Sequence, residues 1–81
     1  MNELHLEIIT PEKTLFRGNI ELVEVPGKRG RFTVMQNHAP IISSLDKGGI
    51  RVKDTNGQEL NFDCQNGYLE CSENKVSILL N

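Results

Sequence analysis

The sequence lacks features that would place it in several large classes of protein. It has no tryptophan, one tyrosine, three phenylalanines and a net charge of −2, so it offers no basic face with interleaved aromatic side chains for single-stranded nucleic acid. No apolar run approaches the roughly 18 residues that a membrane-spanning helix needs. The start, Met1 to His5, has neither the basic residues nor the apolar segment of a secretory signal. We therefore expect one small domain with no nucleic-acid partner and no transmembrane segment of its own.

The residues that usually carry chemistry are few and scattered. Cys64 and Cys71 are the two cysteines, too few for a disulfide scaffold and too far apart for a common metal pair. We predict reduced, buried thiols, because both occupy apolar positions of alternating segments. His5 and His38 show no metal-ligand spacing, and a nucleophile pair of Cys71 with a histidine conflicts with a side chain that faces the core. The sequence predicts no catalytic residues, no metal site and no cofactor.

The pattern that dominates the sequence is alternation of apolar and polar residues with a period of two. It is clearest over residues 4–8, 50–52, 60–64 and 76–80, and it is typical of strands with one buried face. Helical periodicity is almost absent. Because strands that follow one another at short spacing leave no room for parallel crossovers, the pattern predicts an all-β fold: a small, mainly antiparallel β-sandwich or flattened barrel of about eight to ten short strands.

Short glycine-containing motifs between these segments predict the turns. They are Pro26-Gly27, Lys47-Gly48-Gly49, Asn56-Gly57 and Asn66-Gly67, in which glycine or asparagine tolerates a positive φ. Asn56-Gly57 is the clearest hairpin signal. The inward positions of the strands give the predicted core: Leu4, Leu6, Ile8, Phe16, Val23, Val25, Ile50, Val52, Leu60, Phe62, Leu69, Cys71, Val76 and Ile78.

Several motifs, in order, resemble those of one known family. The letters NHAPII at 37–42 and GIRV at 49–52 are similar to the "GHAPL" and "G.IRI" signature of F-type ATP synthase epsilon subunits. LEIITPE at 6–12 resembles the opening strand and turn of that family, LFRG at 15–18 its "F.G" element, and GYLEC at 67–71 with NKVSIL at 74–79 its ending. Each motif alone is weak, but their order and spacing cover essentially the whole chain.

The resemblance implies a noncatalytic rotor subunit of the central stalk. Such a subunit links the gamma subunit to the c ring, within the catalytic core complex, and helps couple proton or sodium flow to ATP synthesis. It implies that residues 1–81 are the epsilon-type N-terminal β-sandwich domain and that the C-terminal helical hairpin of most relatives is absent, together with its ATP binding and its restraint of hydrolysis. The implied location is peripheral, on the cytoplasmic face of the bacterial inner (plasma) membrane.

The resemblance also implies two contact surfaces. The gamma-subunit interface would comprise Thr10, His38, Ala39, Pro40, Ile42 and Ser43, and the c-ring-facing loop Lys28, Arg29, Arg31 and Phe32. Pro40 fixes its own φ and stiffens the loop, and one of the adjacent Ile41 and Ile42 should point outward. Many relatives carry acidic residues where this chain has a basic turn, so complementarity predicts an acidic or carbonyl-rich partner. A solvated turn and a site for anionic lipid headgroups are the other interpretations.

A second class of function is a lipoyl or biotinyl carrier domain. Such domains are small β modules that present a lysine at a hairpin tip, and Lys47 lies at a predicted turn. Against this interpretation, Lys47 is followed by Gly48-Gly49 and preceded by the irregular segment Ser43-Ser44-Leu45. The alternative predicts covalent modification of Lys47, whereas the epsilon resemblance predicts binding to a gamma subunit.

Overall fold

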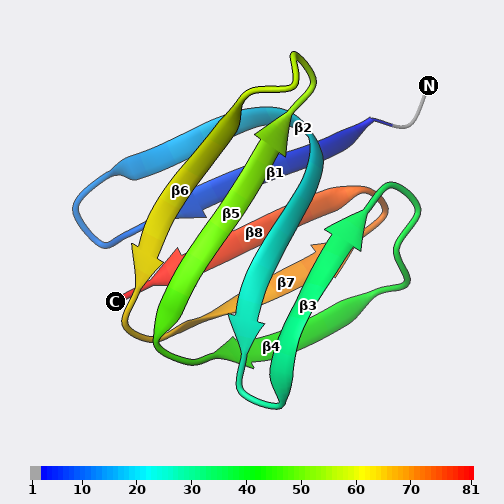
Figure 1. The fold of residues 1–81 in the computed structure, drawn as a ribbon. Coiled ribbons are helices and arrows are strands. Elements are labelled where there is room, and N and C mark those ends of the chain that lie inside the picture. The colour runs from blue at the N-terminus through cyan, green and yellow to red at the C-terminus, as the bar shows by residue number, and fades with distance from the viewer. Residues whose placement is uncertain (1–2) are drawn as a thin grey trace.

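The computed structural model describes residues 3–81, which form two layers of strands packed face to face (Figure 1). This part of the chain contains eight strands and no helix. The strands are β1 (Leu4–Ile9), β2 (Thr14–Gly27), β3 (Gly30–Met35), β4 (Ile41–Leu45), β5 (Gly48–Asp54), β6 (Glu59–Cys64), β7 (Gly67–Ser72) and β8 (Lys75–Leu80). The predicted all-β fold is confirmed. No helix in the described residues has the length and apolar character to cross a membrane.

The long strand β2 belongs to both layers and joins them. Its first half pairs antiparallel with β1, and its second half lies between β3 and β5. One layer therefore holds β1, β8, β7 and β4, and the other holds β3, β5 and β6 (Figure 1). The expectation of uniformly short strands misses β2, whose 14 residues exceed those of every other strand described.

Most strand pairs are antiparallel, as the sequence predicts, but β1 and β8 pair in parallel. Leu6 lies opposite Val76 and Ile8 opposite Ile78 in this pair. The short-spacing argument does not forbid such a pair, because these strands come from opposite ends of the chain and the strands between them form the connection. The parallel pair brings the first and last strands of the described chain together.

The core lies between the two layers and follows the predicted alternation. Eleven of the predicted core residues are buried, and Phe16, Leu60 and Phe62 are corrections, because they are only partly buried and pack against the edge of the core. Phe16 and Phe62 meet edge to face there, with ring centroids 6.2 Å apart. Large rings at this edge keep part of their surface in solvent. Four further apolar residues are buried that the predicted core does not include: Ile20, Val34, Leu45 and Leu80. Cys64, predicted as a buried thiol, also belongs to the core.

The turns are partly as predicted. Asn56-Gly57 does connect the β5–β6 hairpin, with Gly57 at φ 83°. Asp54 supports this turn, because its carboxylate accepts hydrogen bonds from the backbone N–H groups of Asn56 and Gln58, each at 2.9 Å.

The prediction of a turn at Pro26-Gly27 is wrong. Both residues end β2, and Gly27 lies opposite Gly30, so the turn itself consists of Lys28 and Arg29. A Cβ on Gly27 would lie 2.8 Å from the carbonyl oxygen of Gly30, so glycine serves close strand approach here rather than a bend.

The other two glycine signals also lie beside their turns. Gly48 and Gly49 begin β5, and Gly67 begins β7. The segments before them pass between strands that are not hairpin partners, since β4 pairs with β7 and β5 pairs with β6. Glycine marks the start of a strand at these places.

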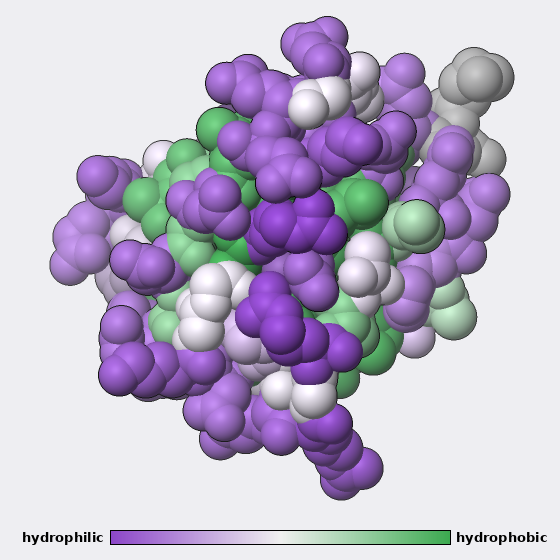
Figure 2. Space-filling model, in the orientation of Figure 1, coloured by the Kyte–Doolittle hydropathy of each residue, from purple (hydrophilic) through white to green (hydrophobic). Residues whose placement is uncertain are grey.

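The outer face of the layer that contains β5 is polar. Ion pairs cross its strands: Lys53 with Glu21 at 3.2 Å, and Arg51 with Glu24 and Glu59 at 3.1 Å each. Figure 2 shows this side of the molecule as mainly hydrophilic, with apolar atoms visible only between polar side chains. Ion pairs exposed to water are strongly screened and contribute little to the free energy of folding, so this face favours solubility more than stability.

Candidate functional site

The predicted c-ring-facing residues surround a tight turn. Lys28 and Arg29 are the two turn residues between β2 and β3, and both are exposed. The backbone N–H of Lys28 donates a 3.0 Å hydrogen bond to the carbonyl oxygen of Ser44, which fastens the turn to β4. The backbone of the turn that carries the two charged side chains is therefore held in place.

Arg31 does not act with Lys28 and Arg29. Its guanidinium donates a 2.9 Å hydrogen bond to the carbonyl oxygen of Gly49 and lies 3.6 Å from the carboxylate of Glu24. The hydrogen bond from Arg51, and more weakly the charge of Arg31, hold the pKa of Glu24 below its ordinary value. Arg31 thus belongs to the ion-paired face, and the predicted group of three free bases is reduced to two.

The predicted gamma-contact loop between β3 and β4 is fixed by two asparagines. The N–H of Asn37 donates a 2.6 Å hydrogen bond to Oδ1 of Asn74, whose Nδ2 donates back to Oδ1 of Asn37 at 3.2 Å. Both residues have positive φ, 66° and 62°, which asparagine tolerates better than most residues. This Asn37–Asn74 clasp joins the loop to the β7–β8 turn and positions His38, Ala39 and Pro40.

Within this loop, His38 is half-buried while Ala39 and Pro40 are exposed. The backbone N–H of His38 donates to the carbonyl oxygen of Met35 at 3.2 Å, and Nδ1 lies 2.7 Å from the carbonyl oxygen of Ala39. The histidine therefore has local partners, and its ring helps to hold the loop.

β4 alternates as expected at its start. Ile41 packs against the core, whereas Ile42 is 74% exposed and Ser43 is half-buried. Met35 and Tyr68 are the other large apolar side chains that the structure exposes, at 53% and 48%. The expected outward isoleucine is confirmed as Ile42.

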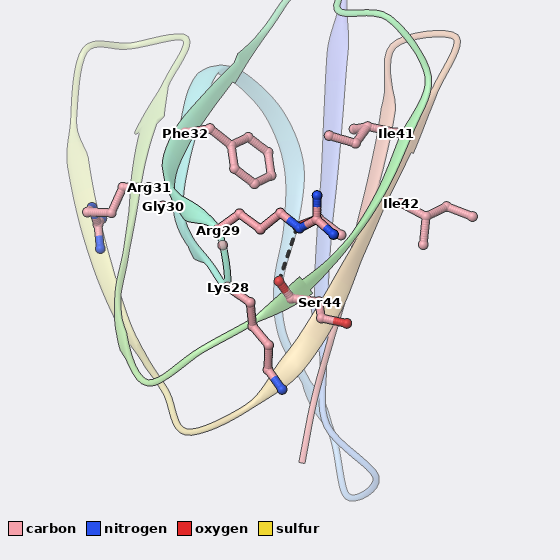
Figure 3. Close-up of a pocket in the computed structure, with 10 residues that line it drawn as sticks. Lys28, Arg29, Gly30, Arg31, Phe32, Ile41, Ile42 and Ser44 are labelled. Carbon is pink, nitrogen blue, oxygen red and sulfur yellow. Dashed lines mark hydrogen bonds between the residues drawn. The ribbon is translucent and has the colours of Figure 1, made fainter.

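The structure joins parts of the two predicted surfaces in one groove. The edge groove is lined by residues 27–32 and 41–44 and has a volume of about 660 Å³. In Figure 3, Arg29 extends from the β2–β3 turn toward β4, Ile41 and Phe32 lie at the interior end, and Ile42 points away. The lining contains three basic residues and no acidic one. A second hollow of about 400 Å³ lies on the other side of Ile42, beside Pro40 and Glu70.

Thr10 lies apart from the other predicted gamma contacts. Its side chain caps the β1–β2 turn, accepting hydrogen bonds from the N–H groups of Glu12 at 3.3 Å and Lys13 at 3.1 Å. The strand pairings place four residues in one row across the layer: Ile9 of β1, Leu79 of β8, Tyr68 of β7 and Ser44 of β4. Thr10 follows Ile9 and so lies near the Ser44 end of β4. The loop that carries His38 lies beyond the opposite end of β4. Thr10 and His38 therefore lie at opposite corners of this layer.

Sequence reasoning missed Tyr68 and Glu70 as neighbours of this surface. They lie on β7 directly opposite Ser44 and Ile42, and they alternate with the buried Leu69 and Cys71. The alternation was visible in the sequence and implied that both side chains point outward. The pairing of β7 with β4, which places them beside Ile42, was not.

The thiols and histidines that might have carried chemistry are buried or have local partners. Cys64 and Cys71 are free thiols and are each 1% exposed, which confirms their predicted state. Burial raises the pKa of both thiols, and the carboxylate of Asp46 raises that of Cys64 further. His5 contacts Asn19, with 3.2 Å between Nδ1 and Oδ1. Residues 3–81 contain no group of three potential metal ligands.

Lys47 is exposed at a bend between β4 and β5. These two strands are not paired with each other, because β4 pairs with β7 and β5 with β2 and β6. Lys47 therefore does not occupy a hairpin tip, which is the feature that the carrier interpretation requires.

Known proteins match this chain along nearly its full length. A family described as "ATP synthase, Delta/Epsilon chain, beta-sandwich domain" matches residues 3–81. The ATP synthase epsilon chain of Caulobacter vibrioides is 37% identical over 79 residues, which cover 98% of this chain and 91% of the relative. The epsilon chain of Campylobacter curvus is 40% identical, and the match covers 98% of this chain but 61% of the relative. The epsilon chain of Leptospira borgpetersenii is 35% identical, with 61% of its length covered.

Solved structures show the same fold at low sequence identity. A chain in the Euglena gracilis mitochondrial ATP synthase structure, which contains OSCP, F1 and the c-ring, superposes with a TM-score of 0.91 at 13% identity. The superposition covers 99% of this chain and 51% of the other. A chain in the central stalk and c-ring structure of Tetrahymena thermophila gives a TM-score of 0.80 at 14% identity, covering 96% and 63%.

Proposed function

Because the chain belongs to the ATP synthase delta/epsilon β-sandwich family, we propose that it is a noncatalytic central-stalk subunit of an F-type ATP synthase. The observation that carries this proposal is the family match over residues 3–81, supported by the 37% identity to an epsilon chain of nearly equal length. In this role the domain links the gamma subunit to the c ring and turns with them. It contributes to the coupling of proton or sodium flow to ATP synthesis without forming an active site.

The arrangement of the described residues suits this role. A stalk subunit must transmit torque between two partners, so it needs a rigid body with fixed contact surfaces rather than a reactive group. The filled core, the fastened β2–β3 turn and the clasped loop at Asn37 meet that requirement. We propose that His38, Ala39, Pro40, Ile42 and Ser43 contact the gamma subunit. We further propose that Lys28 and Arg29 lie where the gamma and c-ring contacts meet, since the edge groove joins their turn to β4.

The domain range and the location are part of the same proposal. Residues 1–81 act as the epsilon-type β-sandwich, without an ATP-binding or hydrolysis-restraining helical hairpin among them. The complex would hold the chain peripherally, at the cytoplasmic face of a bacterial inner membrane. We propose Thr10 as a further gamma contact, at the corner of the same layer opposite to His38.

Affinity purification tests this function against the carrier alternative. A tagged chain expressed in its own organism should bring down the gamma subunit, the catalytic sector and the c ring from detergent-solubilised membranes. Intact mass of the chain should show no added group on Lys47. Recovery of a lipoylated or biotinylated chain without gamma would overturn the proposal. Lys47→Arg, which keeps the charge but blocks acylation, should leave recovery of gamma unchanged.

A further inference from the structure

One strand edge beside the edge groove is left open by the fold. β4 pairs with β7 along its whole length, from Ile41 opposite Cys71 to Leu45 opposite Gly67. Its other edge meets β2 at a single position, Gly27 opposite Leu45. Two hydrogen bonds make this contact: Lys28 N–H to Ser44 O at 3.0 Å, and Asp46 N–H to Pro26 O at 2.7 Å.

These two bonds fix which backbone groups of β4 face the groove. Successive residues of a strand direct their N–H and C=O groups to alternate edges. Since the carbonyl of Ser44 points toward β2, the N–H and C=O of Ile42 point to the same edge, where the edge groove lies. No backbone hydrogen bond to Ile42 on this edge occurs among residues 3–81. The N–H and C=O of Ile42 therefore point to the same edge without a partner, and another strand can add there by hydrogen-bonding to both.

The side chains around this edge favour an acidic occupant with an apolar neighbour. Phe32 and Ile41 form an apolar floor, since both pack against the core and are only partly buried. Lys28 and Arg29 are exposed at the mouth, and no acidic residue lines the groove. This local positive charge contrasts with the net charge of −2 of the whole chain. Charge complementarity therefore selects a carboxylate for the mouth.

We propose that the edge groove binds an extended segment of the gamma subunit that adds as a strand to the free edge of β4. This inference rests on the proposed function. The segment hydrogen-bonds the N–H and C=O of Ile42, directs an apolar side chain toward Phe32 and Ile41, and places an Asp or Glu beside Arg29. The alternation of side chains along an extended segment permits both contacts within a few residues.

Other occupants fit the groove less well. A second copy of this chain that added by the same edge about a twofold axis would bring Lys28 and Arg29 close to their own counterparts, and like charges would oppose it. Anionic lipid headgroups or free phosphate would satisfy the two charges but would leave the backbone of Ile42 without a strand partner. Each of these alternatives is an outcome of the tests below.

The first test isolates the backbone hydrogen bond at Ile42. Ile42→Pro removes the N–H, and Ile42→Ala is the matched control, because it shortens the side chain but keeps the N–H. Proline is tolerated here, since this N–H takes no part in the β4–β7 ladder and Ile41 is already extended. We expect Ile42→Pro to bind isolated gamma subunit about tenfold more weakly than Ile42→Ala, the effect of one lost hydrogen bond. Thermal unfolding followed by circular dichroism verifies that both variants fold.

The second test observes the wild-type edge directly. Amide hydrogen exchange of the labelled chain, measured by NMR, should slow at Ile42 and Ser44 when the gamma subunit binds. The amide of Ser43 faces β7 and should already be protected, so it serves as the internal reference. Equal exchange at Ile42 with and without bound gamma would overturn strand addition.

The third test concerns the acidic side chain of the occupant. Arg29→Glu should weaken gamma binding several-fold at low salt and less at high salt. Lys13→Glu changes the net charge equally at the distant β1–β2 turn and is the matched control. If Arg29→Glu and Lys13→Glu weaken gamma binding equally, the gamma segment places no carboxylate beside Arg29. Two other outcomes would overturn strand addition by gamma. One is self-association of the chain in place of gamma binding. The other is binding to vesicles of anionic lipid that competes with gamma and is unaffected by Ile42→Pro.

Failure of the inference is distinguishable from failure of the proposed function. If the wild-type chain binds gamma and Ile42→Pro binds as Ile42→Ala does, gamma docks by another surface and the strand addition is wrong while the stalk function stands. If the wild-type chain does not bind gamma at all, the proposed function fails and the inference with it.

Discussion

Cys64 and Cys71 illustrate how a residue's environment decides its chemistry. Both thiols are 1% exposed and face the core, Cys64 from β6 and Cys71 from β7. A buried thiol resists ionisation because the thiolate loses its hydration, so burial raises the pKa of each. These cysteines therefore act as small apolar residues rather than as nucleophiles.

We predict that both thiols react slowly with a thiol reagent in the folded protein. Labelling should be on the order of a hundredfold slower than in denaturant, because the reagent must wait for the strands to open. The raised pKa also has a consequence for stability. The unfolded chain releases these protons at a lower pH than the folded chain, so stability should fall as pH rises above the ordinary thiol pKa. Cys64→Ala/Cys71→Ala should show a smaller fall over that range, and rapid labelling of both native thiols would contradict the prediction.

Arg31 shows where residue-level prediction from the sequence fails. Its place between Arg29 and Phe32 suggested a shared basic loop, but β3 directs its side chain toward Gly49 and Glu24 on the neighbouring strands. Whether an exposed base is free or ion-paired depends on which residues the nearby strands place beside it. The pairing of β2 with both β3 and β5, which places Glu24 and Gly49 near Arg31, is what the sequence did not reveal.

At the scale of elements, the alternating strands were predictable and their partners were not. Residues 4–8 and 76–80 read clearly as strands, because a period of two reflects one buried face. Their parallel pairing, and the pairing of β7 with β4 that assembles the candidate site, depend on contacts between distant segments. The site residues could be proposed from motifs, whereas the groove that joins residues 27–32 to 41–44 required the fold.

Gly67 is predicted to be required for the start of β7. A Cβ at this position would overlap the carbonyl oxygen of Leu79 on β8, and neither backbone can withdraw without breaking the pair. We expect Gly67→Ala to lower the free energy of unfolding by about 2–3 kcal/mol. Gly49→Ala is the control, because no atom lies within 4 Å of its added Cβ. That variant should be neutral or stabilise by about 0.4–1 kcal/mol. Urea denaturation of both variants measures the difference, and equal stabilities would contradict the prediction.

The Asn37–Asn74 clasp is predicted to hold the loop that carries His38. Asn74→Ala removes both side-chain hydrogen bonds and places alanine at φ 62°, so it should destabilise by about 1–2 kcal/mol. Asn74→Gly removes the same bonds but accepts this φ, and it should be the milder change. In both variants the amide of Asn37 should exchange faster with solvent. Unchanged exchange would mean that the loop keeps its geometry without the clasp.

At the scale of the whole molecule, charge is divided between two sides of the sandwich. The outer face of β5 carries bases paired with acids, such as Lys53 with Glu21 and Arg51 with Glu24. Lys28 and Arg29 lie in the edge groove, whose lining contains no acidic residue. A subunit that must dock in one orientation benefits from such a division, because the paired side attracts little and the unpaired charges guide the encounter.

The charge of the edge groove should therefore control how fast the stalk assembles. Lys28→Glu/Arg29→Glu reverses two exposed charges without breaking an ion pair to Glu24, so thermal stability should stay within about 0.5 kcal/mol of the wild type. In reconstitution from separate subunits, its association rate with the gamma subunit and c ring should fall roughly three- to tenfold at low salt. The loss should shrink at high salt, because the Debye length falls from about 10 Å at 0.1 M to about 3 Å at 1 M. Arg31→Met provides the contrast, since it should lower thermal stability through the lost contacts with Glu24 and Gly49 while changing the association rate less. Association of the double variant at the wild-type rate at every salt concentration would show that Lys28 and Arg29 only solvate the turn.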